Sequence, residues 1–186
     1  ALDSVRLLER RALQAALEKL PKAQPKRLVM DEFALFKGHR YASVVLDADT
    51  RRVLWIGEGR SRAAIRPFFE ELGPEGCARI EAVAMDMNTA FDLEVRQHCP
   101  QARVVYDLFH VVAKYGRESE IPALKQFAKR LRGYWRGILS RVRWPMHTGQ
   151  LEGINNRIKV IKRMAYGYRD SEFFFMKIKN DFPGNP

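Results

Sequence analysis

The sequence predicts a mixed α/β fold, in which helices flank a five-stranded mixed sheet and a basic helical part follows. Three observations carry this prediction. Short apolar runs of strand composition lie between residues 28 and 106, and turn residues or helical patterns separate them. Three of these runs lead into an aspartate, at Asp31, Asp86 and Asp107. No internal repeat or low-complexity tract indicates a different architecture.

An amphipathic helix is predicted over residues 2–20. Apolar side chains recur there at helical spacing, and arginine and glutamate fill the other face. Pro21 and Pro25 end the helix and make a short linker. We expect this helix to pack against the domain or to connect it to a preceding part, without a chemical role.

Three strands joined by turns come next, as an antiparallel meander. Gly38-His39 and the run from Asp47 to Thr50 have the composition of turns. The predicted strands are residues 28–36, 41–46 and 52–57.

After the meander, helices and strands alternate. Ser61 can cap the first helix, which Gly73-Pro74 ends, and Asn88 or Thr89 caps the second. The predicted elements are a helix from 61 to about 72, a strand at 80–85, a helix at 90–98, a strand at 102–106 and a helix from 108. Three meandering strands followed by this alternation give the element order of a ribonuclease H-like sheet.

The chain therefore divides into four predicted segments. They are an N-terminal helix and linker (1–25), a ribonuclease H-like core (26–116), a helical connector (117–148) and a C-terminal helical segment (149–186). No apolar run reaches the roughly 20 residues of a membrane span, so no membrane partner is expected. The two cysteines, Cys77 and Cys99, have no metal-ligand spacing and favour a reduced, cytoplasmic setting.

The charge distribution predicts a polyanionic partner. The formal net charge is +11, and from Arg117 onward fifteen basic side chains face six acidic ones. Such an excess favours nucleic acid, because lysine and arginine neutralise phosphates regardless of base sequence. The residues expected to contact DNA are Lys125, Lys129, Arg130, Arg136, Arg157, Lys159, Lys162, Arg163, Tyr166 and Arg169.

The aspartates indicate metal-dependent phosphoryl transfer. Two divalent ions about 3.5–4 Å apart need several shared carboxylates, and hard oxygen ligands suit magnesium. If the strands before Asp31 and Asp86 are neighbours, the two carboxylates face each other. Glu32 should point to the opposite face of its strand, because side chains alternate. Taken alone, an aspartate at a strand end is more often a turn or cap residue.

Glu152 is the candidate for a third carboxylate. It lies beside the apolar helix face of Leu151, Ile154 and Ile158, so a packed helix would present it toward the sheet. Asn155 and Asn156 follow one turn later, where they could orient a carboxylate or contact a phosphate.

These residues stand in longer motifs that resemble the catalytic domain of bacterial insertion-sequence transposases of the ISL-three type. The motifs are Asp31–Tyr41, Val83–Met87, Asp107–His110 and Glu152–Asp170. The resemblance runs from about 28 to 182, and the last motif is the most specific. It implies a DDE enzyme with Asp31, Asp86 and Glu152 as catalytic metal ligands.

The resemblance also implies two Mg²⁺ ions, with Mn²⁺ as an alternative, and strand transfer of transposon ends into target DNA. Asp107 and His110 match an Asp-x-x-His feature of related groups and would support the site. A homo-oligomer on DNA and a bacterial, nucleoid-associated location are further expectations. A buried histidine on an apolar helix face is the alternative for His110.

Two departures from the family pattern leave alternative functions open. No N-terminal zinc-binding or helix-turn-helix pattern is present, and only about 45 residues separate Asp107 from Glu152, where the family carries a long helical insertion. The position at which the family's insertion would begin falls near residues 117–121. The chain is thus expected to be a DDE transposase, or else a truncated derivative that only binds DNA, or a stand-alone nuclease of the same fold.

Overall fold

A computed structural model describes residues 2–36, 40–106, 140, 143, 144, 146, 149–165, 168 and 170–185. Within this part of the chain, no helix is long and apolar enough to cross a membrane.

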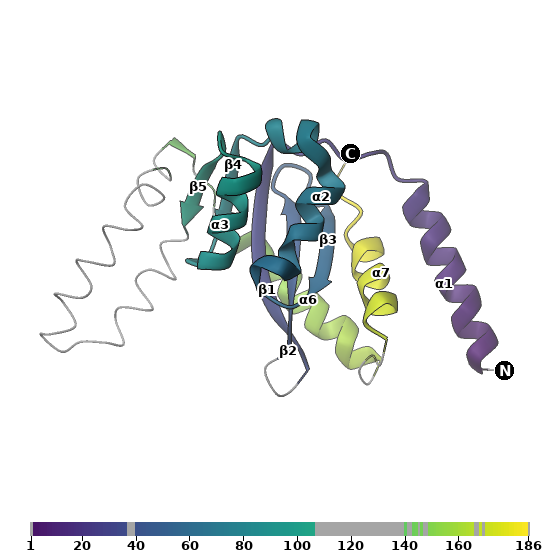
Figure 1. Ribbon diagram of the computed structural model, residues 1–186. Coiled ribbons are helices and arrows are strands. Elements are labelled where there is room, and N and C mark those ends of the chain that lie inside the picture. The colour runs from purple at the N-terminus through teal and green to yellow at the C-terminus, as the bar shows by residue number, and fades with distance from the viewer. Residues whose placement is uncertain are drawn as a thin grey trace, which may run out of the picture.

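One mixed sheet forms the centre of the molecule (Figure 1). Its first three strands make the antiparallel meander that the sequence predicts, and the last two run parallel to the first. The spatial order is β3-β2-β1-β4-β5. The strands are β1 (Arg27–Phe36), β2 (Arg40–Asp47), β3 (Val53–Glu58), β4 (Ala82–Met85) and β5 (Arg103–Tyr106).

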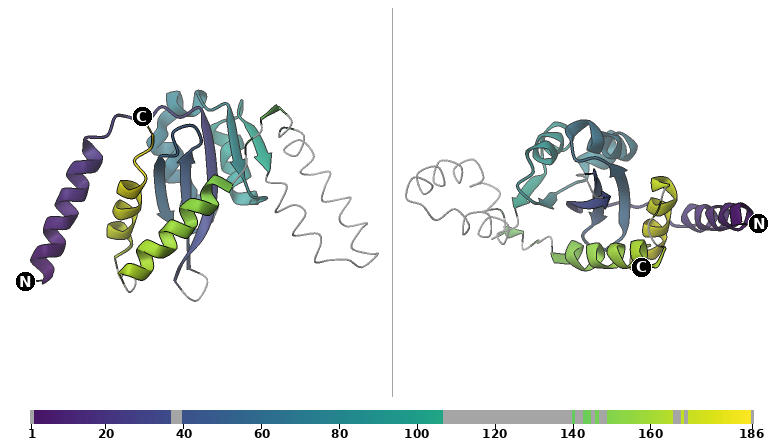
Figure 2. Two further views of the ribbon diagram at one scale, coloured as in Figure 1. Left: turned by 180° about the vertical axis from the view of Figure 1, so that it is seen from behind. Right: turned by 90° about the horizontal axis from the view of Figure 1, so that it is seen from below.

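Helices cover both faces of the sheet (Figure 2). One face carries α2 (Arg62–Ala78) and α3 (Thr89–His98). The other face carries α6 (Gly149–Met164) and α7 (Ser171–Asp181). The N-terminal helix α1 (Leu2–Glu18) lies outside α7. The mixed α/β, ribonuclease H-like fold class is confirmed.

Alternating side chains divide the core into two layers. Val29, Phe33 and Ala84 point toward α6 and α7, where they pack with the buried face of α6. Met30 and Met85 point the other way, toward α2 and α3. The predicted apolar face of α6 is confirmed, because Leu151, Ile154 and Ile158 are all buried.

Side-chain caps set the starts of three helices. Ser61 accepts a hydrogen bond from the Ala64 amide (3.2 Å), as predicted, and Asn88 rather than Thr89 caps α3. Asp170 caps α7 through the Phe173 amide (3.1 Å). Each cap satisfies an amide that has no partner inside its helix.

The predicted break of the helix at Gly73-Pro74 is confirmed, but α2 continues beyond it, which the sequence did not predict. Gly73 breaks the regular helix with φ 72°, a value that glycine adopts without steric cost, but helical structure resumes and continues to Ala78. Pro74 begins the new turn, where its fixed φ fits and its missing N–H costs no hydrogen bond.

The N-terminal helix packs against the C-terminal one, as expected of an element without a chemical role. Arg6 and Arg10 reach the carboxylate that caps α7, Asp170, at 3.5 and 3.2 Å. Lys177 of α7 forms an ion pair with Glu9. Three side chains on the outer surface of α1, Val5, Leu7 and Leu8, are exposed.

Candidate active site

The parallel pairing of β1 with β4 brings two aspartates to one place. Met30 is paired with Met85, so the next residues along the two strands are Asp31 and Asp86. Alternation along β1 puts Asp31 on the face of Val29, under α6, and Asp86 directly follows Met85, the last residue of β4. The adjacency on which the predicted carboxylate pair depends is therefore present.

Both carboxylate oxygens of Asp31 accept hydrogen bonds. The side-chain amide of Asn155 donates to Oδ2 over 2.8 Å, and the backbone N–H of Glu32 donates to Oδ1 over 2.8 Å. Asn155 lies 124 residues away in the sequence, so this bond joins α6 to the strand that carries the aspartate. The other amide atom of Asn155, Oδ1, is buried and accepts no hydrogen bond from the described residues.

One flank of α6 carries a row of polar side chains. Residues three, four or seven positions apart lie on the same side of a helix. This spacing places Glu152 one turn before Asn155, and it places cations in the next two turns on the same flank. The row consists of Glu152, Asn155, Lys159, Lys162 and Arg163.

Glu152 is exposed and lies one helical turn from the residue that contacts Asp31. Among the residues that the structure describes, no three His, Cys, Asp or Glu side chains are grouped closely enough to hold a metal ion. The two aspartates and the exposed glutamate nevertheless offer only hard oxygen donors, and side chains one turn apart are about 5–6 Å apart at Cβ. The donor chemistry of the three carboxylates therefore suits magnesium, whereas Glu152 is not grouped with the two aspartates in this structure.

Three of the described cations of the predicted DNA surface differ in their partners. Arg157 lies on the opposite flank of α6, where it forms an ion pair with Asp181 of α7 at 2.9 Å. Lys159 is exposed, 3.4 Å from the side chain of the equally exposed Asn156. Arg163 is exposed as well, and no carboxylate of the described residues pairs with Lys159 or Arg163. Two cations on the Glu152 flank are thus available to phosphates.

The other predicted site residues lie outside the described part of the chain. They are Asp107, His110, Lys125, Lys129, Arg130, Arg136, Tyr166 and Arg169.

Glu32 belongs to the opposite face of the sheet, as the alternation of side chains predicts. Its carboxylate accepts hydrogen bonds from Arg60 (2.9 Å) and from Asn88, the cap of α3 (3.2 Å). The Glu32 carboxylate therefore stabilises the start of α3, and it lies on the other face of the sheet from Asp31.

A second carboxylate, which we did not predict from the sequence, is fully buried on that face. Glu94 of α3 accepts hydrogen bonds from Arg62 (2.6 Å) and Arg66 (3.1 Å) of α2. His98 lies 3.3 Å from it and stacks on the Phe69 ring. Hydrogen bonds from Arg66 and Arg62 lower the pKa of Glu94. Two sequence patterns could have indicated this cluster: Arg62 and Arg66 are four residues apart, and so are Glu94 and His98, so each pair lies on one helix face.

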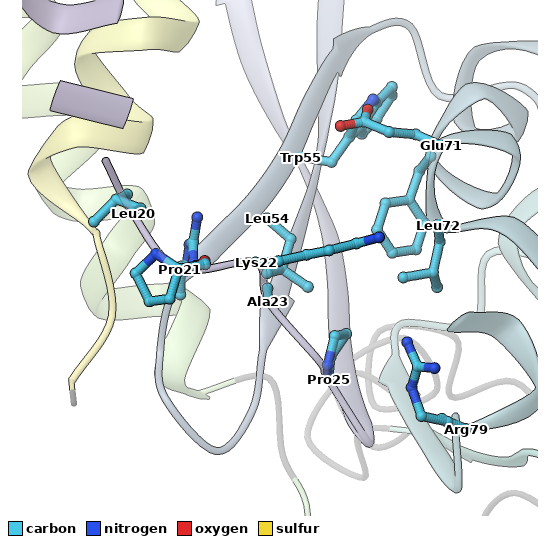
Figure 3. Close-up of a pocket in the computed structure, with 12 residues that line it drawn as sticks. Leu20, Pro21, Lys22, Ala23, Pro25, Leu54, Trp55, Glu71, Leu72 and Arg79 are labelled. Atoms are coloured by element: carbon cyan, nitrogen blue, oxygen red, sulfur yellow. The ribbon is translucent and has the colours of Figure 1, made fainter. Parts of the chain in front are cut away.

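The pocket drawn in Figure 3 lies away from the carboxylates. Its walls come from the linker after α1, from β3 and from α2, and Lys22 extends across it toward Leu72. Glu71 and Arg79 also line this pocket, whereas Asp31 and Asp86 do not. The candidate carboxylates therefore lie outside this pocket.

The two cysteines are unsuited to nucleophilic chemistry. Both are buried, and burial raises the pKa of Cys77 and raises that of Cys99 to about 12. A thiol with such a pKa is almost entirely protonated at neutral pH, whereas the thiolate is the nucleophile.

Comparison with known proteins matches this chain to transposases. The profile of a family described as "Transposase", the ISL-three group of DDE transposases, matches residues 28–118 and 115–178. The transposase for insertion sequence element IS1001 of Bordetella parapertussis is 40% identical over 272 residues, covering 98% of this chain and 67% of that protein. The transposase for insertion sequence element IS1557 of Mycobacterium tuberculosis is 37% identical over 91 residues, covering 49% of this chain and 20% of that protein.

The chain thus spans about two-thirds of the Bordetella relative and a fifth of the mycobacterial one. The 272-residue match is longer than this chain of 186 residues, so the Bordetella protein carries residues inside the match that have no counterpart here.

Proposed function

Because the chain belongs to the ISL-three family of insertion-sequence transposases, we propose that it carries the catalytic centre that cuts DNA at transposon ends and joins them to target DNA. One observation carries the proposal within the structure. Asp31 and Asp86 follow paired residues of two parallel strands, and α6 is hydrogen-bonded to Asp31 through Asn155. The family supports the expectation of transposition, and this arrangement supports Asp31 and Asp86 as members of the proposed centre.

The residues proposed to hold two Mg²⁺ ions, or Mn²⁺ in their place, are Asp31, Asp86 and Glu152. Bound ions would supply Lewis acidity toward the scissile phosphate and lower the pKa of the attacking hydroxyl or water. Asn155 contributes by fixing the orientation of the Asp31 carboxylate, since its amide and the Glu32 N–H hold one oxygen each. A carboxylate held in this way loses little freedom when a ligand arrives.

The proposed chemistry has two phosphoryl-transfer steps. Water attacks the phosphorus at the transposon end, the bond to the 3′ oxygen breaks, and a free 3′-hydroxyl results. This hydroxyl then attacks a phosphorus of target DNA and displaces another 3′ oxygen, so the number of phosphodiester bonds is conserved in the second step. No covalent bond between protein and DNA is needed in either step.

The cations beside the proposed centre would hold the DNA. Lys159 and Arg163 lie on the same flank of α6 as Glu152, and phosphate contacts of this kind position DNA without reading its sequence. Asn156, Arg157 and Lys162, together with the predicted cations outside the described residues, are proposed as further contacts. The assembly on DNA is proposed to be a homo-oligomer, with Asp107 and His110 supporting the site.

A cleavage assay on the DNA ends of its own element, with and without Mg²⁺, tests the proposal. The unmodified chain should cut at the end in Mg²⁺ and transfer a pre-cleaved end to a target plasmid. Asp31→Asn, Asp86→Asn and Glu152→Gln should each lose at least about a hundredfold in rate while binding the same DNA. Full cleavage by any of the three variants would refute its assignment as a metal ligand.

A DNA-binding derivative without chemistry is the second candidate. The residues of the Bordetella relative that have no counterpart in this chain favour it. DNA binding with no metal-dependent cleavage would support this alternative. Cleavage without transfer of a pre-cleaved end would instead indicate a nuclease of the same fold.

A further inference from the structure

The β1–β2 hairpin continues well past the two aspartates. β4 ends at Met85, directly before Asp86, whereas β1 runs five residues beyond Asp31, to Phe36. In Figure 1 the paired ends of β1 and β2 extend beyond β4 and β5. At about 3.3–3.4 Å per residue, Phe36 lies roughly 17 Å from Asp31 along the strand.

Helix α6 follows this extension. Asn155 contacts Asp31, and two turns later Lys162 donates to the backbone carbonyl of Leu35 and lies 3.5 Å from that of Ala34. Helix and strand therefore run in the same direction from the aspartates toward the hairpin end. The flank of α6 that carries Glu152 and Lys159 forms one continuous strip with this end.

A β-bulge turns an aromatic side chain toward α6. The register of β1 with β2 shifts between Ala34 and Phe36, so Phe36 pairs with Arg40 and packs against the core layer under α6. Simple alternation would have placed Phe36 on the face of Ala34, pointing away from α6. A bulge that re-aims a side chain next to a functional site is a common use of this irregularity.

The Phe36 ring lies between two cations from different elements. The Arg40 guanidinium from β2 is 4.7 Å from the ring centroid, and the Lys162 ammonium from α6 is 5.5 Å from it. Each of these cation–π contacts holds a positive charge in place without neutralising it. We refer to Phe36, Arg40 and Lys162 as the hairpin cluster.

The charge of Lys162 is partly buried without an acidic partner. Its contacts are the two carbonyls and the Phe36 ring, and none of the described carboxylates forms an ion pair with it. Desolvation lowers its pKa accordingly. Arg40 has one exposed partner, Glu58 at 3.2 Å, and more than half of its side-chain surface is open to solvent. A phosphate at the cluster would supply the counter-charge that Lys162 lacks.

We infer that the hairpin cluster is a second DNA contact, which holds a backbone phosphate of the duplex three to five base pairs from the phosphate at Asp31 and Asp86. The span follows from about 10 Å along α6 and about 17 Å along β1, divided by 3.4 Å per base pair. Phe36 acts as a positioning residue, since it keeps the two cations together. This inference rests on the proposed function, which sets where the reacting phosphate lies.

The test compares two lengths of duplex. DNA that carries the cleavage site is made with flanks of about one or about twelve base pairs, so that only the long duplex reaches the hairpin cluster, and affinity is measured by fluorescence anisotropy over a range of salt concentrations. Arg40→Gln should weaken binding to the long duplex by roughly tenfold at low salt and reduce the salt slope by about 0.9. Binding to the short duplex should not change. Equal losses on both duplexes, or none on either, would overturn the inference.

Two further variants separate positioning from folding. Phe36→Leu keeps an apolar side chain but removes the ring, so it should weaken binding to the long duplex, while Phe36→Tyr should restore it. Combined with Arg40→Gln, Phe36→Leu should add little further loss, because both changes act on one contact. Full additivity would show that Phe36 does not act through Arg40. Arg79→Gln is the matched control, because Arg79 is an exposed cation at the pocket drawn in Figure 3. This variant should bind both duplexes normally.

The outcomes also separate this inference from the proposed function. A length-dependent loss in a chain that never cleaves DNA would support the second contact and count against catalysis. Normal cleavage with no length-dependent loss would support catalysis and count against the second contact.

Discussion

The two faces of the sheet use their acidic residues differently. Under α2 and α3, Glu94 is fully buried and its charge is compensated by Arg62 and Arg66. Under α6, Asp31 is partly exposed and accepts hydrogen bonds from two neutral donors, the Asn155 amide and the Glu32 N–H. A hydrogen bond from a neutral donor orients a carboxylate without neutralising it, whereas two arginines compensate the charge. We therefore expect one face to determine activity and the other to determine stability.

The largest effect is expected on the α6 face. Asn155→Ala removes the amide that orients Asp31, and loss of such a supporting hydrogen bond typically costs ten- to a hundredfold in metal affinity or activity. The rate of DNA-end cleavage should fall by that factor, and more Mg²⁺ should be needed for half-maximal rate. Titrating Mg²⁺ in the cleavage assay measures both.

The stability of this variant is the control. Its urea unfolding midpoint should stay close to that of the unmodified chain, because only one partly exposed hydrogen bond is lost. A large drop in stability with unchanged Mg²⁺ dependence would mean that Asn155 serves the fold alone.

Glu94→Gln should show the reverse pattern. The amide has the shape of the carboxylate but leaves two arginines without a counter-charge, and hydrogen bonds to charged groups contribute about 1.5–3 kcal/mol each. Because both arginines are partly exposed, we expect the free energy of unfolding to fall by about 1–2 kcal/mol. Urea denaturation at neutral pH measures it. DNA-end cleavage below the unfolding range should be unaffected, and a parallel loss of cleavage would break the comparison.

The same residue should make stability depend on pH. The pKa of Glu94 is lower in the folded protein than its ordinary value of 4.5, chiefly because of its hydrogen bond with Arg66. Below that value the unfolded chain binds the proton first, so the contribution of Glu94 is complete above about pH 5 and declines as the pH falls further. Unfolding midpoints measured from about pH 7 to about pH 4 should fall more steeply for the unmodified chain than for Glu94→Gln. Identical slopes would contradict the assignment.

The smallest expected effect is a difference in the salt dependence of DNA binding between variants of two cations of α6. Lys159 lies on the Glu152 flank without an ion pair to a described carboxylate, whereas Arg157 is paired with Asp181 on the other flank. Lys159→Gln should reduce the salt slope of DNA binding by about 0.9, the value for one lost phosphate contact. Arg157→Gln should change the salt slope less and leave the urea unfolding midpoint nearly unchanged, because exposed ion pairs contribute little to stability. A larger slope change for Arg157→Gln would reverse the roles of the two flanks.

The fold could be predicted from the sequence because strand and helix periodicities dominate in the first 106 residues. The meander, the caps at Ser61 and Asn88, and the buried face of α6 all follow from local patterns. The continuation of α2 beyond Gly73 does not, because proline both ends one helix and starts the next. The orientation of Phe36 was equally hidden, since a bulge changes the alternation by one residue without a sequence signal.

Only part of the site follows from local pattern. The positions of Asp31 within its strand and of Asp86 directly after its strand were predictable, but their proximity required β4 to lie beside β1, a fact of topology. The bond from Asn155 to Asp31 joins residues too distant for any periodicity to link. Glu94 escaped prediction for a related reason, because both arginines that bury its charge come from another helix.

The distance of Asn155 from Asp31 along the chain has a consequence for synthesis. The whole sheet is complete by Tyr106, so this part can fold while the ribosome is still adding the remaining residues. At about 5–20 residues per second, Asn155 is made roughly 2–10 s later. The nascent protein would then pass through a stage in which both strand aspartates are in place while α6 is absent. The proposed ligand Glu152 and the orienting residue Asn155 would thus join the two aspartates only at this later stage.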